Sequence, residues 1–153
     1  MDCGFLRLPA HPDLETYFLE QDKLLVVLPE DHALADCERF LVKALADYPF
    51  MLLEKGAKAE IWEIFERCQV MQKIHFATWD DYAIMSMVES GLGISILHRL
   101  ILRRVPYRII TKELDVPAFR NIGLALGSKK NSSLAVKRFL EYMEYRQHLI
   151  SVN

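Results

Sequence analysis

Short apolar runs alternate with stretches of helical periodicity along this chain, a pattern typical of α/β proteins. The densest apolar run covers residues 23–28 and is closed by Pro29, so we predict a buried strand there. In residues 57–68 the apolar side chains recur at helical spacing and predict an amphipathic helix. We expect further strands at residues 5–8, 14–19, 50–53, 74–77, 93–97, 107–110 and 122–126, and further helices at residues 42–46, 78–90 and 98–103 and after Ser133.

Polar and glycine residues mark the ends of the helix expected at residues 78–90. Thr78 is expected to be its N-cap, and Asp80 and Asp81 fall in its first turn, where carboxylates interact favourably with the helix dipole. We expect Gly91 to end the helix and Gly93 to allow a close backbone approach before the next strand. These glycines do not form a dinucleotide-binding motif, because in that motif a strand precedes the glycines and a helix follows them.

Composition narrows the possible classes of protein. The chain has 153 residues, 52% of them hydrophobic, which is enough for one domain with a substantial core. Its formal net charge of -2 argues against direct binding of DNA or RNA, because phosphate contacts need a basic surface. No apolar run reaches the length of a membrane span, and the first residues do not resemble a signal peptide. We therefore expect a cytoplasmic protein.

The residues that carry catalysis or bind metals form no known pattern in this chain. Cys3, Cys37 and Cys68 are widely spaced and form no CxxC pair, so we expect reduced thiols and neither a zinc site nor a disulfide. The five histidines are scattered, and no GxSxG or HExxH motif is present. We expect Trp62 and Phe65 to be core residues. The sequence therefore predicts no enzyme activity, no metal and no cofactor.

Several stretches of the chain, in this order, resemble the effector-binding domain of LysR-type transcription regulators. They are DCGF and LP at residues 2–5 and 8–9, LLVVLP at 24–29, HALA at 32–35, FMLLEKG at 50–56, MVESGLGISIL at 87–97 and RNIGLAL at 120–126. The resemblance spans nearly the whole chain, although the family usually has proline at the positions of Ala33 and His98. The resemblance does not include the family's DNA-binding winged helix-turn-helix or its linker helix, so we expect both to be absent from this chain.

The resemblance implies a two-lobe α/β fold of the type II periplasmic-binding-protein class. Residues 1–30 and 120–153 would form lobe I, truncated at its N-terminus, and residues 31–119 would form lobe II. Two crossing segments, near Leu28 and near Arg120, would act as the hinge. Homodimers or higher oligomers are expected, because family members usually dimerise and an incomplete lobe I would leave an unpaired sheet edge.

Two strand-to-helix turns are the candidate ligand-binding site. In open α/β sheets, ligands bind beyond the carboxyl ends of the strands, where helix N-termini attract anions. The turns follow the strands expected at residues 50–53 and 74–77, and family members place effector-contacting residues in them. The residues carried over are Gly56, Ala57, Lys58, Thr78 and Trp79, and Phe5, Arg7 and Leu8 would face them from lobe I.

Four of these side chains also have a purely structural explanation. Thr78 can serve only as a helix cap, and Trp79 can belong to the core. Lys58 can be a solvated surface charge, and Arg7 can lie on an exposed strand face.

The resemblance predicts a sensor that binds a small anionic metabolite in the cleft between the lobes and contacts DNA only through the absent domain. The alternative is a solute-binding protein of a transport system, which has the same two-lobe fold. A small enzyme on a similar fold is a third interpretation, and turnover of candidate metabolites would reveal it.

Overall fold

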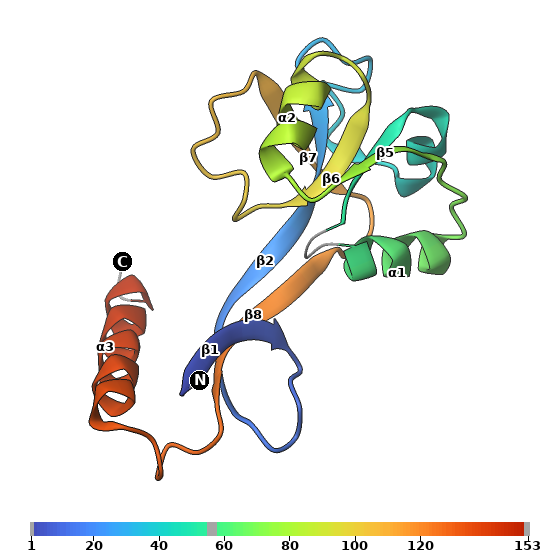
Figure 1. Ribbon diagram of the computed structural model, residues 1–153. Coiled ribbons are helices and arrows are strands. Elements are labelled where there is room, and N and C mark those ends of the chain that lie inside the picture. The colour runs from blue at the N-terminus through green and yellow to red at the C-terminus, as the bar shows by residue number, and fades with distance from the viewer. Residues whose placement is uncertain (1, 55–57, 152–153) are drawn as a thin grey trace. The chain divides into compact units, whose positions relative to one another are not determined.

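The computed structural model describes residues 2–54 and 58–151 (Figure 1). The strands are β1 (Cys3–Leu8), β2 (Glu15–Pro29), β3 (Arg39–Phe40), β4 (Phe50–Leu53), β5 (Ile74–Thr78), β6 (Ile94–His98), β7 (Ile109–Leu114) and β8 (Phe119–Leu126). The helices are α1 (Lys58–Cys68), α2 (Asp81–Glu89) and α3 (Leu134–Ser151), and η1 (Val42–Asp47) is a 3-10 helix. Among the described residues, no helix is both long and apolar enough to cross a membrane.

The chain divides into two compact units. Unit 1 comprises residues 1–21 and 121–153, and unit 2 comprises residues 22–120. In unit 2 the strands pair in the order β3-β7-β2-β6-β4-β5. Strands β4, β5 and β6 are mutually parallel, whereas β2 runs antiparallel to β6 and β7. The carboxyl ends of β4, β5 and β6 therefore share one edge of the sheet with the beginning of the unit 2 part of β2.

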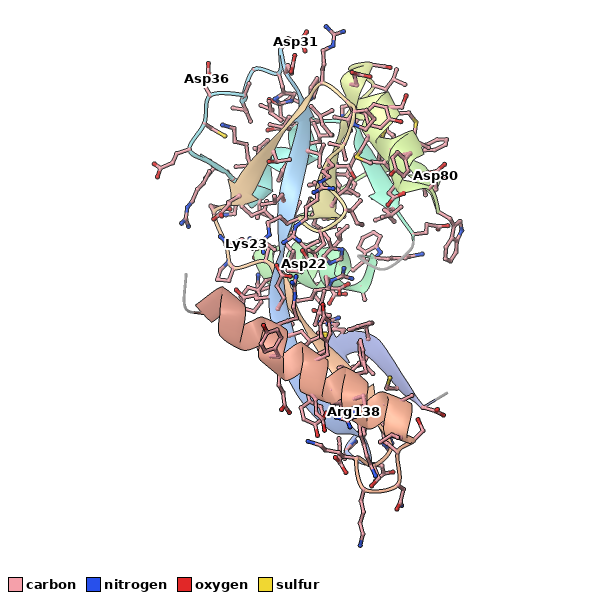
Figure 2. All side chains as sticks on the ribbon, turned by 90° about the vertical axis from the view of Figure 1, so that its left-hand side faces the viewer. Asp22, Lys23, Asp31, Asp36, Asp80 and Arg138 are labelled. Carbon is pink, nitrogen blue, oxygen red and sulfur yellow. The ribbon has the colours of Figure 1, made fainter. Side chains whose placement is uncertain are left out.

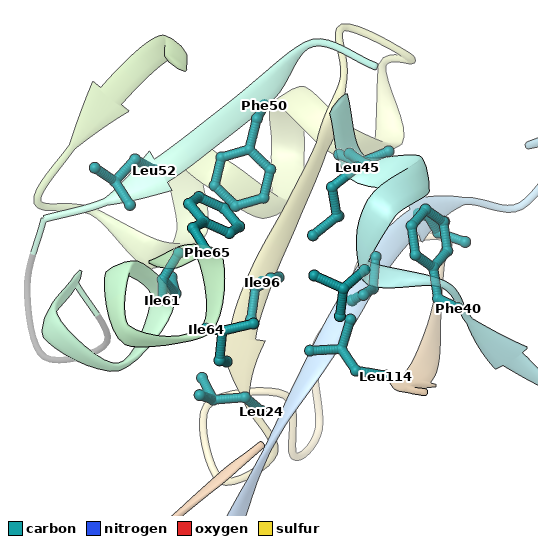
Figure 3. Close-up of a cluster of buried hydrophobic side chains, with 14 residues drawn as sticks. Leu24, Phe40, Leu45, Phe50, Leu52, Ile61, Ile64, Phe65, Ile96 and Leu114 are labelled. Carbon is teal, nitrogen blue, oxygen red and sulfur yellow. The ribbon is translucent and has the colours of Figure 1, made fainter. Parts of the chain in front are cut away.

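Alternating side chains of these strands give unit 2 two apolar layers, one on each face of the sheet. On β2, Leu24, Val26 and Leu28 join the layer formed with α1 and η1, which Figure 3 shows, and Val27 joins the layer formed with α2. Val26, Val27 and Leu28 are fully buried. Burial of each such side chain stabilises the fold by about 1.5–3 kcal/mol, which explains why the densest apolar run lies in the middle of the sheet.

Unit 1 consists of β1, β8 and the first part of β2, with α3 covering one face. Strand β1 pairs antiparallel with β8 from Cys3↔Leu126 to Leu8↔Asn121. Leu124 and Leu126 form a small apolar core with Val136 and Leu140 of α3. Helix α3 begins after Ser133, whose hydroxyl accepts a hydrogen bond from the Val136 amide at 3.4 Å.

Several elements differ from the sequence-based expectations. Residues 14–19 and 23–28 were expected to form two strands, but β2 is one strand of 15 residues. The polar residues Glu20, Gln21 and Asp22 interrupt the apolar pattern without ending the extended backbone. The helix expected at residues 98–103 is wrong, because His98 ends β6 and the following residues form turns. Strand β7 also begins later than expected, at Ile109.

Two side-chain expectations are also corrected. The N-cap of α2 is Asp80 and not Thr78, because the Asp80 carboxylate accepts hydrogen bonds from the Tyr82 and Ala83 amides. Trp62 is not a core residue: it remains 38% exposed and contacts the buried Phe65 ring edge-on.

Both glycines of the Gly91-Leu92-Gly93 segment have the structural roles expected of them. Gly91 follows α2 with a φ of +73°, a left-handed conformation that suits glycine. At Gly93 a Cβ atom would lie 2.4 Å from the Pro49 carbonyl oxygen, so the missing side chain allows β6 to approach the start of β4.

Candidate functional site

The two predicted turns meet at the carboxyl edge of the unit 2 sheet. Strands β4 and β5 are parallel, and Leu53 lies opposite Thr78. The Glu54 amide, one residue beyond β4, donates a hydrogen bond of 2.9 Å to the Thr78 carbonyl oxygen. The segment that leads to α1 therefore starts beside the segment that leads to α2, as a site shared by the two turns requires.

Lys58 is the first residue of α1 and directly follows the turn after β4. Its ammonium group lies 3.5 Å from the Glu54 carboxylate, and the two side chains are 48% and 30% exposed. Such a partly exposed i,i+4 pair contributes only about 0.3–0.5 kcal/mol, so Lys58 can exchange this partner for an anionic ligand at small cost. The other two predicted residues of this turn, Gly56 and Ala57, lie outside the described residues.

Thr78 and Trp79 complete the unit 2 part of the predicted site. The Thr78 hydroxyl accepts a weak hydrogen bond of 3.3 Å from the Asp80 amide, which leaves its own proton available to another acceptor. Trp79 is 69% exposed, so the alternative that it belongs to the core is wrong. Its indole can offer an apolar wall and one N–H donor to a bound molecule.

The three predicted residues of unit 1 all lie on β1 but do not share one face of the strand. Phe5 and Arg7 point to one side and Leu8 to the other, because side chains alternate along a strand. The Phe5 ring is 63% exposed and contacts Phe139 of α3 edge-on, with 6.4 Å between ring centroids. Leu8 packs against the backbone at Gly123.

A buried ion pair, which the sequence did not reveal, lies at the same sheet edge as Thr78. Asp22 is fully buried on β2 and is bound by the Arg120 guanidinium, with an N–O distance of 3.0 Å. Figure 2 labels Asp22 and its neighbour Lys23 on β2. The available signal was a lone acid directly before the densest apolar run, but the sequence alone could not identify its partner.

Next to it, Lys23 forms an ion pair with Glu113 of β7 on the more exposed side of β2. The Lys23 ammonium donates a hydrogen bond to the Glu113 carboxylate. This hydrogen bond and the charge of Lys23 hold the pKa of Glu113 below its ordinary value, with smaller contributions from Arg39 and Arg99. The two successive residues Asp22 and Lys23 therefore connect β2 to different parts of unit 2.

One hollow among the described residues lies away from the predicted turns. It has a volume of about 660 Å³ and lies past the C-terminal half of α1, where Trp62, Phe65, Val70 and Met71 line it. None of the predicted site residues that the structure describes borders this hollow. Among the described residues, no cluster of three or more histidine, cysteine or acidic side chains could hold a metal ion.

Comparison with known proteins identifies the family. The model of the LysR substrate binding domain matches residues 1–147. YvbU of Bacillus subtilis, an uncharacterised HTH-type transcriptional regulator, is 31% identical over 92% of this chain and 49% of its own length. LrrA of Synechococcus elongatus, a probable HTH-type transcriptional regulator, is 27% identical over 94% of this chain and 49% of its own. The chain thus spans about half the length of these curated relatives.

Two solved structures with bound ligands resemble this chain in fold. The regulatory domain of CcmR from Synechocystis PCC6803, in complex with 2-PG, has a TM-score of 0.82 and 25% identity and covers 93% of this chain and 71% of its own. The effector-binding domain of QuiR, in complex with shikimate, has a TM-score of 0.76 and 25% identity over 93% and 69% of the two chains. The fold is the α/β type of the periplasmic-binding-protein class that these domains share. The chain belongs to the LysR substrate-binding domain family.

Proposed function

We propose that this chain is the effector-sensing domain of a transcription regulator and that it binds a small anionic metabolite where the turns after β4 and β5 meet. The hydrogen bond between the Glu54 amide and the Thr78 carbonyl carries this proposal, since it brings the two turns together at the ligand-binding edge of the sheet. Lys58 supplies a positive charge, Thr78 a hydroxyl and Trp79 an apolar wall. Gly56 and Ala57 would let the ligand approach the backbone at the start of α1.

On β1 of unit 1, we propose Phe5, Arg7 and Leu8 as further candidate ligand contacts, as the sequence resemblance implies; Phe5 and Arg7 share one face of the strand and Leu8 lies on the other. The ligand regulates the protein by binding one conformation more tightly than another, which shifts their populations. In the parent regulator this shift passes to a DNA-binding domain, and the protein acts in the cytoplasm, without catalysis, as a homodimer or higher oligomer. The names of the curated relatives favour this role over that of a transport-related solute-binding protein.

A thermal-shift screen of carboxylates and amino acids, including shikimate and 2-PG, tests the proposal. A ligand present at one hundred times its Kd stabilises the folded chain by about 2.7 kcal/mol, so a true effector raises the Tm measurably. Thr78→Val should abolish the shift, Thr78→Ser should keep most of it, and Lys58→Met should weaken binding about tenfold, equivalent to about 1.4 kcal/mol.

The matched control is Thr111→Val, which removes an exposed threonine hydroxyl from β7 of the same unit. It should leave the ligand-induced shift unchanged. A shift that survives Thr78→Val as well as it survives Thr111→Val would remove Thr78 from the site.

The proposal that a separate domain binds the DNA has its own test. In a gel-shift assay at physiological salt, this chain should not bind an operator-like duplex specifically, because its net charge is -2 and specific binding needs phosphate contacts. Tight sequence-specific binding by the chain alone would refute this part of the proposal.

A further inference from the structure

An ion pair joins the first and the last residue of unit 2, where the chain enters and leaves this unit. Its first residue is Asp22 and its last is Arg120. The Arg120 Nε and Nη2 atoms both donate to the Asp22 Oδ2 atom, at 3.2 Å and 3.0 Å. Asp22 is 0% exposed and the Arg120 side chain 21% exposed, so water screens this pair little.

A third segment joins the ion pair through its backbone. The Leu100 amide donates to the other Asp22 carboxylate oxygen at 3.0 Å, so each oxygen of the buried carboxylate has a donor. The neighbouring backbone is tied in the same way: the Arg99 amide donates to the Lys23 carbonyl oxygen at 2.8 Å and the Leu24 amide to the Ala118 carbonyl oxygen at 2.9 Å. We call Asp22, Arg120 and the Leu100 amide the clasp.

Because the Asp22 carboxylate is buried, we expect the hydrogen bonds of the clasp to form or break together. Removing one partner of a buried ion pair is strongly destabilising, because the remaining charge stays in a poorly solvated site. Opening the clasp while unit 2 stays folded would leave Asp22 in that state. The segments before Leu24 and after Ala118 are therefore held together at the edge of the sheet that also carries Thr78.

We propose that Asp22 and Arg120 are positioning residues: the clasp keeps both crossing segments fixed to unit 2, so that bending occurs at the junctions Gln21–Asp22 and Arg120–Asn121. Only the link between this bending and the effector rests on the proposed function. The hinge then lies outside the buried part of β2 around Leu28, where all side chains pack within unit 2.

Amide hydrogen exchange tests whether the clasp behaves as one local unit. In Arg120→Met and in Asp22→Asn, the Leu24, Arg99 and Leu100 amides should exchange at least ~30-fold faster than in the wild type, because local opening exposes them together. The Ile84 amide of α2 should keep its wild-type rate. Arg120→Lys, which keeps the charge but has a single donor group, should be intermediate.

The matched control is Lys23→Met, which removes the neighbouring, more exposed ion pair with Glu113 and leaves the clasp intact. It should leave these three exchange rates within about threefold of the wild type. Equal acceleration in α2 and at the clasp, or equal rates in Arg120→Met and Lys23→Met, would overturn the proposal. Should Arg120→Met not fold, Asp22→Asn and Arg120→Lys provide the same comparison.

A second measurement follows the positioning itself, which a purely stabilising role would not affect. Spin labels at Arg138→Cys in unit 1 and Met71→Cys in unit 2, with the three native cysteines replaced by alanine, report the distribution of distances between the units. Arg120→Met should broaden this distribution about twofold relative to Lys23→Met, as expected when a hinge loses its constraint. Identical distributions would overturn the proposal, and since no ligand is needed, a failed ligand screen would not affect this result.

Discussion

His32 lies in the loop after β2 in surroundings that disfavour its protonated form. Burial lowers the pKa of His32 below its ordinary value of 6.5, and the nearby Asp31 offsets only part of this effect. The Nδ1 atom accepts a hydrogen bond from the Leu34 amide at 3.1 Å, which a protonated nitrogen could not do. The imidazole also packs on the Tyr48 ring, with 4.5 Å between centroids.

This residue should make stability depend on pH. Between the lowered pKa of His32 and its ordinary value, the unfolded chain binds more protons than the folded one, so its contribution to the unfolding free energy is present above pH 6.5 and is lost as the pH falls. Urea unfolding from pH 7.5 to 5 measures the slope. His32→Asn keeps an acceptor for the Leu34 amide and should flatten the slope. His11→Asn, at a histidine that is 71% exposed, should not, and equal slopes in the two variants would contradict the assignment.

Gly91 and Gly93 should respond differently to the same substitution, because their backbones need glycine for different reasons. Gly93→Asn places a Cβ atom 2.4 Å from the Pro49 carbonyl oxygen and should cost about 1–3 kcal/mol of unfolding free energy. Gly91 has a positive φ with nothing within 4 Å of a Cβ, and asparagine tolerates that conformation, so Gly91→Asn should cost well under ~1 kcal/mol. Chemical denaturation measures both values, and the reverse order would show that the close approach at Gly93 is unimportant.

At the scale of elements, the sequence predicts those strands and helices whose apolar pattern is decided locally. Strands β4 and β6 lie between apolar layers on both faces, so their mainly apolar sequences predict buried strands. The sequence does not predict the central part of β2, around Gln21, because its residues are polar. The backbone nevertheless remains extended where the chain passes from unit 1 to unit 2. The sequence predicts a helix at residues 98–103 because the apolar residues 100–102 are flanked by arginines, but residues 99–104 form turns.

For the candidate site, too, the features with local sequence signals could be predicted and the long-range contacts could not. The turns after β4 and β5 could be located because strand ends and helix starts have local sequence signals. The partners of Asp22 could not, because Arg120 is 98 residues away and Leu100 contributes only its amide, which no side-chain pattern encodes. Long-range pairing of polar groups therefore limits how much of such a site can be predicted from one sequence.

The start of α2 gives an element-scale prediction that separates the two candidate caps. Asp80→Ala removes the acceptor for the Tyr82 and Ala83 amides and should lower the unfolding free energy by about 0.5–2 kcal/mol. Asp80→Asn should cost less, because asparagine is a good N-cap. Thr78→Val should cost less than Asp80→Ala, since the one hydrogen bond to the Thr78 hydroxyl from the described part of the chain is weak, at 3.3 Å. Thermal denaturation measures these differences, and a larger loss for Thr78→Val would restore Thr78 as the cap.

At the scale of the whole molecule, the open edge of unit 1 should control association. Among the described residues β1 pairs only with β8, so its other edge presents unpaired backbone N–H and C=O groups, and Phe5 on this strand is 63% exposed. Unpaired edges invite pairing with another chain, so we expect light scattering to show a dimer or a larger species.

A lysine on an edge strand opposes such pairing, so Phe5→Lys should shift the chain towards monomer. Leu92→Lys, at a leucine that is 61% exposed outside any strand, should not. A wild-type chain that remains monomeric at high concentration would contradict the prediction, and equal effects of the two lysines would attribute association to general hydrophobicity.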